Sequence, residues 1–288
     1  MRRTLLLGSS VVVALSLAAC SAASNGSSTG SSSTSAAAAT CTPANLSTHT
    51  AGTLTVATDS PAYEPWFSNN KPANGKGFES AVAFAVAKQL GYTPEQVKWV
   101  TASFNSVIAP TPKKYDFDIN EVSITPARAK AVDFSTGYYD VAQSVITLKG
   151  SKIANAKSIA DLHGAKLGAQ QGTTSLDAIT GVIKPGTTPA EYPTNDLAVQ
   201  ALKNGQIDGL VVDLPTGLYI TAAELDNSII VGQLPVTGTP EQFGLVLTKA
   251  SPLTSCVSKA VDALRADGTL TALQQQWLTT SAGAPELS

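Results

Sequence analysis

The chain contains few of the residues that usually carry metal chemistry or nucleophilic catalysis. Its 288 residues include three cysteines and two histidines, His49 and His163. No G-x-S-x-G, H-E-x-x-H or phosphate-binding-loop motif occurs, and no Cys/His cluster has metal-ligand spacing. We therefore expect neither a metal nor another cofactor. Basic residues number 19 against 21 acidic ones and form no stripe, which argues against nucleic acid as a partner.

Long hydrophobic runs are missing after the first 20 residues, so we expect no transmembrane segment there. At the N-terminus, Arg2 and Arg3 precede an apolar run, residues 4–17, that is typical of an export signal. Its end, Leu17-Ala-Ala-Cys20, resembles the bacterial lipobox, in which the cysteine becomes the new, lipidated N-terminus. An ordinary signal peptide with Cys20 incidental is the alternative. We expect a signal peptide over residues 1–20 and an extracytoplasmic protein that is lipid-anchored to the outer face of the cell membrane.

Serine and alanine dominate the next segment. Residues 21–40 contain only Ser, Ala, Gly, Thr and one Asn, so they offer nothing for a core, and we assign residues 21–50 to a flexible tether. If Cys20 carries lipid, Cys41 and Cys256 remain as a pair in an oxidising compartment. This predicts a disulfide between the end of the tether and the C-terminal helical region. Two free, buried cysteines are the alternative.

Strand-like and helix-like segments alternate through the rest of the chain, without an internal repeat. The alternation predicts an α/β fold with parallel sheets, whose ligands bind at the carboxyl ends of the strands. We expect the extended residues 138–148 to carry the chain into a second lobe and residues 241–247 to return it. Other strands are expected at residues 53–58, 97–101, 117–122, 165–170 and 208–212. Helices are expected at residues 77–90, 104–109, 158–162, 195–204 with Asn195 as N-cap, 214–223, 252–266 and 269–278.

One segment combines the features of a site for a planar anion. A strand-like run ends near Val122, and Thr125 with Pro126 forms a good N-cap and first position for a short helix. Arg128 follows on its first turn, where free N–H groups and a guanidinium favour a carboxylate. Surface pairing of Arg128 with Asp133 is the alternative.

This segment, residues 122–139 with sequence VSITPARAKAVDFSTGYY, resembles the signature of the family-3 solute-binding proteins of ABC importers for polar amino acids. Further matching pieces follow in order: LTVATD at 54–59, GFE at 77–79, FNSVI at 104–108, QGTTS at 171–175, DGLVVD at 208–213, QFG at 242–244 and LRADG at 264–268 with Trp277. The resemblance implies an α/β, two-lobed periplasmic-binding-protein fold of type II, with a cleft between lobes joined by two crossing strands. Lobe 1 would comprise residues 51–140 and 243–288, and lobe 2 residues 141–242. It also implies a monomer that captures a free amino acid by lobe closure and delivers it to an ABC permease in the membrane.

The resemblance also assigns the ligand's backbone groups. Arg128 would hold the α-carboxylate, and Ser123 and Thr174 would donate to the same group. Asp213 would accept hydrogen bonds from the α-ammonium. Its other role, as N-cap of the helix that follows, is compatible with this one.

Aromatic residues are expected to line the ligand's side chain. Phe104, Tyr63 and Trp66 would form apolar walls and add cation–π attraction to a cationic ligand. Trp66 as a core residue is the alternative. Tyr63 lies one position further from Asp59 than is usual in the family, which leaves open whether Tyr63 or Trp66 faces the ligand.

Specificity is expected to depend on Asp59, Glu121 and Gln170. Two carboxylates in a desolvated cleft repel each other unless a cation lies between them. The presence of both Asp59 and Glu121 therefore indicates a ligand with a cationic or an amide side chain. In the alternative, Glu121 points away and pairs with Lys113, Lys114 or Lys130.

Two other functions remain open on the same fold. A cyclohexadienyl-dehydratase-like lyase would use Glu121 as a general acid, and a ligand-sensing domain would serve a separate signalling receptor. The pairing of Arg128 with Asp213 is the one expected for a zwitterionic amino acid that is bound and released unchanged. We therefore expect a binding protein and no enzyme.

Overall fold

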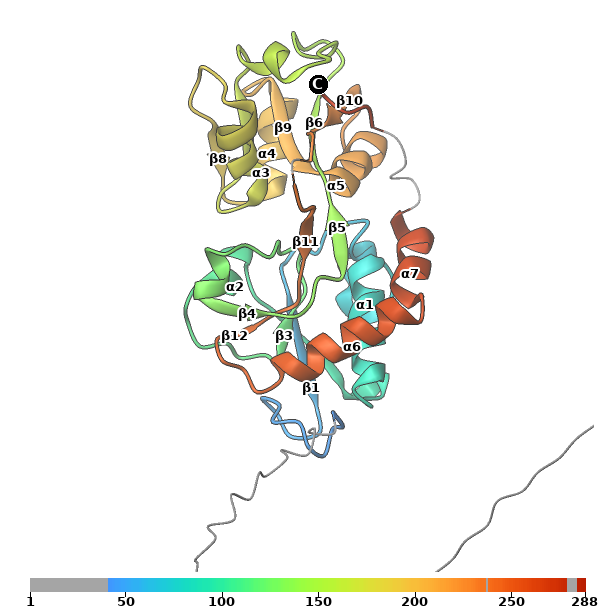
Figure 1. Cartoon of the computed structure of the whole chain (residues 1–288). Coiled ribbons are helices and arrows are strands. Elements are labelled where there is room, and N and C mark those ends of the chain that lie inside the picture. The colour runs from blue at the N-terminus through green and yellow to red at the C-terminus, as the bar shows by residue number, and fades with distance from the viewer. Residues whose placement is uncertain (1–40, 237, 279–283) are drawn as a thin grey trace, which may run out of the picture. The chain divides into compact units, whose positions relative to one another are not determined.

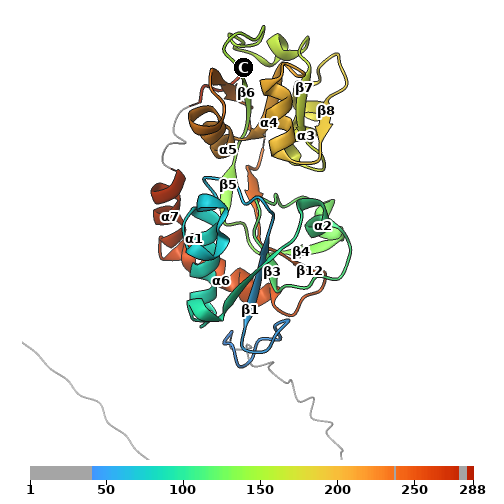
Figure 2. The same cartoon turned by 180° about the vertical axis from the view of Figure 1, so that it is seen from behind.

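Two five-stranded sheets, each flanked by helices, form the two lobes of the structure (Figures 1 and 2). The computed structural model describes residues 41–236, 238–278 and 284–288, which belong to one unit, Thr40–Ser288. The predicted signal peptide, the lipidation site Cys20 and most of the predicted tether lie outside the described residues. No helix within the described ranges is both long and apolar enough to cross a membrane.

The sheet of lobe 1 has the strand order β2-β1-β3-β12-β4. Its strands are β1 (Leu54–Thr58), β2 (Val97–Thr101), β3 (Phe117–Asp118), β4 (Val132–Phe134) and β12 (Val246–Thr248). Its helices are α1 (Phe78–Gln89), α2 (Phe104–Ile108), α6 (Thr254–Ala266) and α7 (Thr269–Leu278), with short 3-10 turns at Ser68–Asn70, Pro72–Asn74, Pro94–Gln96 and Arg128–Lys130. Strand β1 pairs in parallel with β2 and β3 and is buried at all five positions, so it forms the centre of this core.

The sheet of lobe 2 has the order β10-β6-β9-β7-β8. Its strands are β6 (Gln143–Leu148), β7 (Leu167–Gln170), β8 (Ala190–Tyr192), β9 (Gly209–Asp213) and β10 (Ser228–Gln233). Its helices are α3 (Thr174–Ala178), α4 (Asn195–Lys203) and α5 (Leu214–Tyr219), with a 3-10 turn at Ile159–Leu162. Helices α3 and α5 each continue into one turn of π-helix, Ile179–Ile183 and Ile220–Glu224. Strands β7, β8 and β9 are parallel, so their carboxyl ends share one edge.

The chain passes between the lobes in two short antiparallel strands, β5 (Tyr139–Val141) and β11 (Glu241–Phe243). Phe243 pairs with Tyr139, and both rings pack edge-on or tilted against their aromatic neighbours in the lobe 1 core. A rigid aromatic cluster therefore anchors the crossing strands at their lobe 1 end.

Three local predictions were wrong. The strand expected to reach Val122 ends at Asp118, because the backbone turns at Glu121, whose φ is +52°. Thr194, not Asn195, caps α4: its side chain accepts a hydrogen bond from the Leu197 N–H, which leaves Asn195 free to face the cleft. Trp66 belongs to the core, as the next section describes.

The C-terminal residues 284–288 lie on lobe 2, although we expected them in lobe 1. Glu286 forms a bridge with Gln233, and the buried Leu287 packs into the lobe 2 core. The reason is that β10 is an edge strand, whose unpaired N–H and C=O groups accept a further segment.

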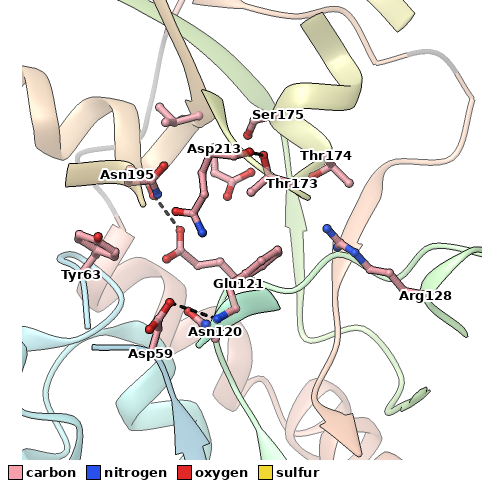
Figure 3. Close-up of a pocket in the computed structure, with 14 residues that line it drawn as sticks. Asp59, Tyr63, Asn120, Glu121, Arg128, Thr173, Thr174, Ser175, Asn195 and Asp213 are labelled. Carbon is pink, nitrogen blue, oxygen red and sulfur yellow. Dashed lines mark hydrogen bonds between the residues drawn. The ribbon is translucent and has the colours of Figure 1, made fainter. Parts of the chain in front are cut away.

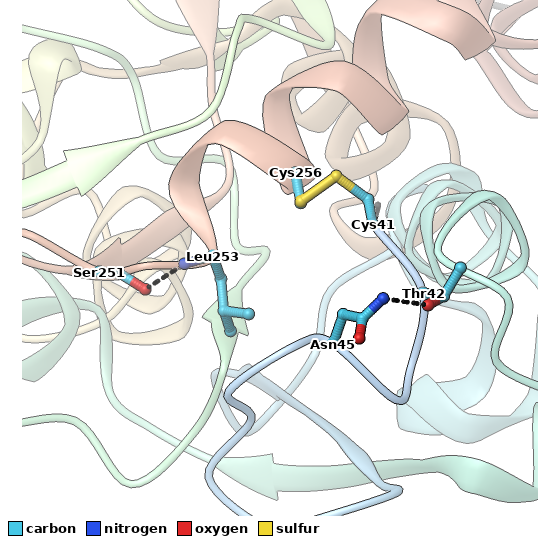
Figure 4. The surroundings of a disulfide bond; sticks show 6 residues. All are labelled: Cys41, Thr42, Asn45, Ser251, Leu253 and Cys256. Carbon is cyan, nitrogen blue, oxygen red and sulfur yellow. Dashed lines mark hydrogen bonds between the residues drawn. A yellow bond between two sulfur atoms is a disulfide. The ribbon is translucent and has the colours of Figure 1, made fainter. Parts of the chain in front are cut away.

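Cys41 and Cys256 form the predicted disulfide, with a Cα–Cα distance of 5.4 Å (Figure 4). It ties the start of the described chain to α6. The tether was expected to extend to residue 50, but Leu46 packs against the lobe 1 core and the His49 N–H donates to Asp116 Oδ1 at 2.6 Å. Residues 41–50, which were assigned to the tether, therefore include residues that pack against lobe 1.

Replacing Cys41 and Cys256 by serine together lowers the free energy of unfolding by about 2–5 kcal/mol. The bond spans 215 residues, and opening so long a loop returns much conformational freedom to the unfolded chain. Urea unfolding of the double variant checks this. Reduced wild-type protein is the control and should lose the same stability; an unchanged midpoint in both would contradict the prediction.

Candidate functional site

A cavity lies between the lobes. Lobe 1 contributes residues that follow β1 and β3, and lobe 2 contributes residues from the ends of β7 and β9 and from the N-terminal turns of three helices (Figure 3). The site thus occupies the edge where parallel strands end, as the alternation of elements predicts. Its lining consists of Asp59, Tyr63, Phe104, Asn120, Glu121, Arg128, Gln170, Thr173, Thr174, Ser175, Asn195, Val212, Asp213 and Thr216.

Eight of the ten predicted site residues line this cavity; Trp66 and Ser123 do not. Trp66 has no exposed surface, and its ring packs against Phe78, Tyr139 and Phe243. Its Nε1 donates a hydrogen bond to Thr216 Oγ1 of lobe 2 at 2.8 Å. Of the two aromatic candidates, Tyr63 therefore lines the cavity and Trp66 supports it from the core.

Arg128 spans the two lobes. The Thr125 hydroxyl accepts from the Arg128 N–H at 3.1 Å, which fixes the start of the short turn. The guanidinium donates through Nη1 to the Ser123 carbonyl at 2.7 Å and through Nη2 to the Gly172 carbonyl at 2.9 Å. Its central carbon lies 5.3 Å from the centroid of the Phe104 ring, within cation–π range.

Asp133, the alternative partner of Arg128, pairs instead with Lys249 at 3.0 Å. Burial lowers the pKa of Arg128, and the nearby Glu241 carboxylate opposes that shift. Because an arginine pKa starts so far above neutrality, the guanidinium stays charged. Its remaining N–H groups can serve an anion in the cavity.

Glu121 points into the cavity. Its Oε2 accepts from Thr216 Oγ1 of lobe 2 at 2.9 Å, and its backbone N–H donates to the buried Glu79 Oε1 at 2.7 Å. Lys113, one of the lysines considered as its partner, donates to the Ser106 and Ala109 carbonyls. The salt bridges found among the described residues join Lys152 to Asp208 and Lys249 to Asp133, so neither involves Glu121.

Two cavity carboxyls have raised pKa values. Burial raises the pKa of Glu121 well above its usual value, and the Glu79 and Asp213 carboxylates add to the shift. Burial also raises the pKa of Asp213, with a further contribution from Glu241. Gln143 Nε2 donates to Asp213 Oδ1 at 2.7 Å and partly offsets this rise. The cavity therefore concentrates acidic groups around a single arginine, and a cation would relieve their repulsion.

Asp59 is held by backbone donors at the lobe 1 side. Its Oδ1 accepts from the Ser60 N–H at 2.7 Å and its Oδ2 from the Phe104 N–H at 3.2 Å, at the start of α2. Gln170 ends β7 on the opposite side and is buried. Hydrogen bonds therefore hold the Asp59 carboxylate in place, and Gln170 lines the cavity from lobe 2.

Sequence reasoning missed Glu241, which holds the hydroxyls expected to serve the ligand. Its Oε1 accepts from Thr174 Oγ1 at 2.5 Å and from Ser123 Oγ, and Gln143 Nε2 lies 3.3 Å from its Oε2. These partners come from three separate segments, so no local pattern indicates them. Thr216 and Asn195 were also missed; both lie in the first turn of a lobe 2 helix, where polar side chains near a cleft could have been suspected.

Comparisons with known proteins agree with this architecture. The model of the bacterial extracellular solute-binding proteins, family 3, matches residues 54–280. The ABC transporter arginine-binding protein 1 of Escherichia coli (strain K12) is 31% identical over 228 residues, covering 77% of this chain and 88% of that protein. An ancestral arginine-binding protein solved with arginine is 32% identical with a TM-score of 0.66, covering 78% of this chain and 98% of the other.

An ancestral amino acid-binding protein, described as a precursor of cyclohexadienyl dehydratase, is 30% identical with a TM-score of 0.64 and covers 79% of this chain and 95% of its own. The overall fold is thus shared with solved amino acid-binding proteins. The predicted fold of the type II periplasmic binding proteins is confirmed. The chain belongs to the bacterial extracellular solute-binding proteins of family 3.

Proposed function

We propose that this protein binds a polar L-amino acid with a cationic or amide side chain outside the cytoplasmic membrane and delivers it to an ABC-type importer. The observation that carries the proposal is the charge arrangement of the cavity between the lobes. Arg128 lies on one side, and the carboxyls of Asp59, Glu121 and Asp213 lie on the others. An amino acid with a cationic side chain complements this arrangement, because its carboxylate can pair with Arg128 and its two positive groups with the carboxyls.

The roles follow from position. Arg128 grips the α-carboxylate in a charge-assisted pair, with Thr174 and Ser123 as further donors. Asp213 accepts from the α-ammonium, and Asp59 and Glu121 receive the side chain. Because burial and neighbouring carboxylates raise the pKa values of Glu121 and Asp213, a bound cation relieves the repulsion between these groups and lowers both pKa values.

Relatives support the ligand class. The names of the similar proteins include arginine-binding, cystine-binding and glutamine-binding proteins. The cationic side chain inferred from Asp59 and Glu121 agrees with the arginine-binding relatives in particular.

Capture by closure fits the contacts between the lobes. Arg128 reaches the Gly172 carbonyl, and Thr216 bridges Trp66 and Glu121. The crossing strands β5 and β11 would act as the hinge. In this proposal, the protein works as a monomer anchored through lipid on Cys20, and the closed form docks on the permease.

A lyase remains the second candidate because of the dehydratase precursor among the similar structures. Glu121, with its raised pKa, would then be the acid. Incubating the protein with prephenate and assaying for product separates the two functions, since a binding protein returns its ligand unchanged.

Thermal-shift screening of the soluble form, residues 41–288, against the twenty amino acids tests the proposal. We expect a large rise in melting temperature with one or two amino acids of the cationic or amide group, because ligand that binds only the folded state stabilises it by mass action. A protein that responds to no amino acid would contradict the proposed function.

A further inference from the structure

Glu241 presents a carboxylate to the donors that the proposed function reserves for the ligand's own carboxylate. It extends from β11, the returning crossing strand, and its Oε1 takes hydrogen bonds from the hydroxyls of Ser123 in lobe 1 and Thr174 in lobe 2. Gln143, at the start of β6, adds its amide N–H group to the other oxygen at 3.3 Å. The side chain thus makes the contacts of a bound α-carboxylate without being part of a ligand.

The two carboxylates cannot share these donors. Each hydroxyl has one proton to donate, and Ser123 Oγ and Thr174 Oγ1 lie 3.2 Å apart around the same acceptor. A second carboxylate would also stand beside the first in a partly desolvated cleft, where like charges repel strongly. Binding through Ser123 and Thr174 therefore requires the Glu241 carboxylate to leave.

Glu241 is electrostatically coupled to both ends of the proposed ligand. Its charge raises the pKa of Asp213, the proposed ammonium partner, and opposes the lowering of the Arg128 pKa by burial. A ligand zwitterion changes both interactions when it arrives: its carboxylate takes the place of Glu241 beside Arg128, and its ammonium lowers the pKa of Asp213 that Glu241 raises.

The hinge offers the displaced side chain another position. Glu241 also lines a separate surface hollow together with Val141, Gln143 and Thr239. Water reaches such a surface hollow, so a carboxylate that turns towards it recovers hydration.

We infer that Glu241 is an internal competitor for the ligand's α-carboxylate and thereby sets the affinity and selectivity of the site. This inference rests on the proposed function. Part of the binding free energy of an amino acid is spent on displacing Glu241. A cationic ligand without an α-carboxylate leaves Glu241 in place and avoids this cost, so Glu241 narrows the preference for amino acids over the corresponding amines.

Calorimetric titration with L-arginine and with agmatine, which lacks the α-carboxylate, tests the inference. Glu241→Gln weakens the competitor and Glu241→Ala removes it. Both variants should bind L-arginine roughly tenfold more tightly than wild type, about 1.4 kcal/mol. Agmatine should bind no more tightly, so the ratio of the two affinities rises about tenfold. Glu191→Gln, an exposed change on β8 with the same loss of charge, should bind both as wild type does.

The outcomes separate the inference from the function on which it rests. If wild type binds L-arginine but neither Glu241 variant binds it more tightly, Glu241 only orients the two hydroxyls and the inference is overturned. If wild type and variants all fail to bind L-arginine, the cationic amino acid ligand itself is wrong and the inference falls with it. Thermal unfolding of each variant establishes that it is folded before it is titrated.

Discussion

Arg128→Ala lowers the affinity for the amino acid ligand by roughly thirtyfold to several thousandfold. The substitution leaves the ligand's α-carboxylate in a desolvated cleft without its cation, and truncating one partner of such a pair costs about 2–5 kcal/mol. It also removes the link between the Ser123 and Gly172 carbonyls, which joins the lobes. Closure and carboxylate binding are therefore lost together.

Calorimetric titration of the ligand found in the screen measures this effect. Lys98→Ala is the control with the same loss of charge, since Lys98 is exposed on β2 in lobe 1 and is not among the residues that line the cavity. It should bind as wild type does. Arg128→Lys should recover only part of the affinity, because an ammonium lacks the planar fork of the guanidinium. If Arg128→Ala bound the ligand as tightly as wild type does, Arg128 would not bind the ligand's α-carboxylate and the prediction would be wrong.

Asp213→Asn should lower the affinity for a cationic amino acid by about 2–5 kcal/mol, which is roughly thirtyfold to several thousandfold. Asp213 is the proposed partner of the α-ammonium, and an amide offers it no charge. The exposed Asp226→Asn, in lobe 2, is the control with the same chemical change. If Asp213→Asn bound the ligand as tightly as wild type, the ammonium would have to lie elsewhere.

The affinity should also depend on pH in a defined direction. Asp213 and Glu121 have raised pKa values before the ligand binds, and a cationic ligand favours their ionised forms, so binding lowers these pKa values and releases protons. Affinity therefore falls as the pH falls through the raised values. Titrations in buffers of different ionisation enthalpy count the released protons, and Asp213→Asn should release fewer.

Part of the candidate site can be predicted from local patterns in the sequence. Arg128 stands out because Thr125 and Pro126, which favour the start of a helical turn, lie just before it, and the Thr125 hydroxyl does accept from the Arg128 N–H. Asp59 and Asp213 follow strands whose burial pattern is readable, and parallel strand ends gather at one edge. The resemblance to family 3 assigned all three residues to the ligand, and the cavity contains all three.

Other parts depend on contacts that no local pattern reveals. Trp66 and Tyr63 are equally plausible walls until the packing of Phe78, Tyr139 and Phe243 takes one of them into the core. Thr194 and Asn195 are both good caps, and only the backbone geometry decides between them. Glu241 has an ordinary position on a short strand, and its partners come from segments far away in the sequence. These features depend on packing between segments that are distant in the sequence, so local sequence patterns could not predict them.

A crystal structure of the protein with the amino acid selected by the screen tests the central claim most directly. The account predicts the ligand between the lobes, with its α-carboxylate on the Arg128 guanidinium, its ammonium on Asp213 and its side chain towards Asp59 and Glu121. A ligand bound with its carboxylate away from Arg128, or outside the cavity between the lobes, would contradict it.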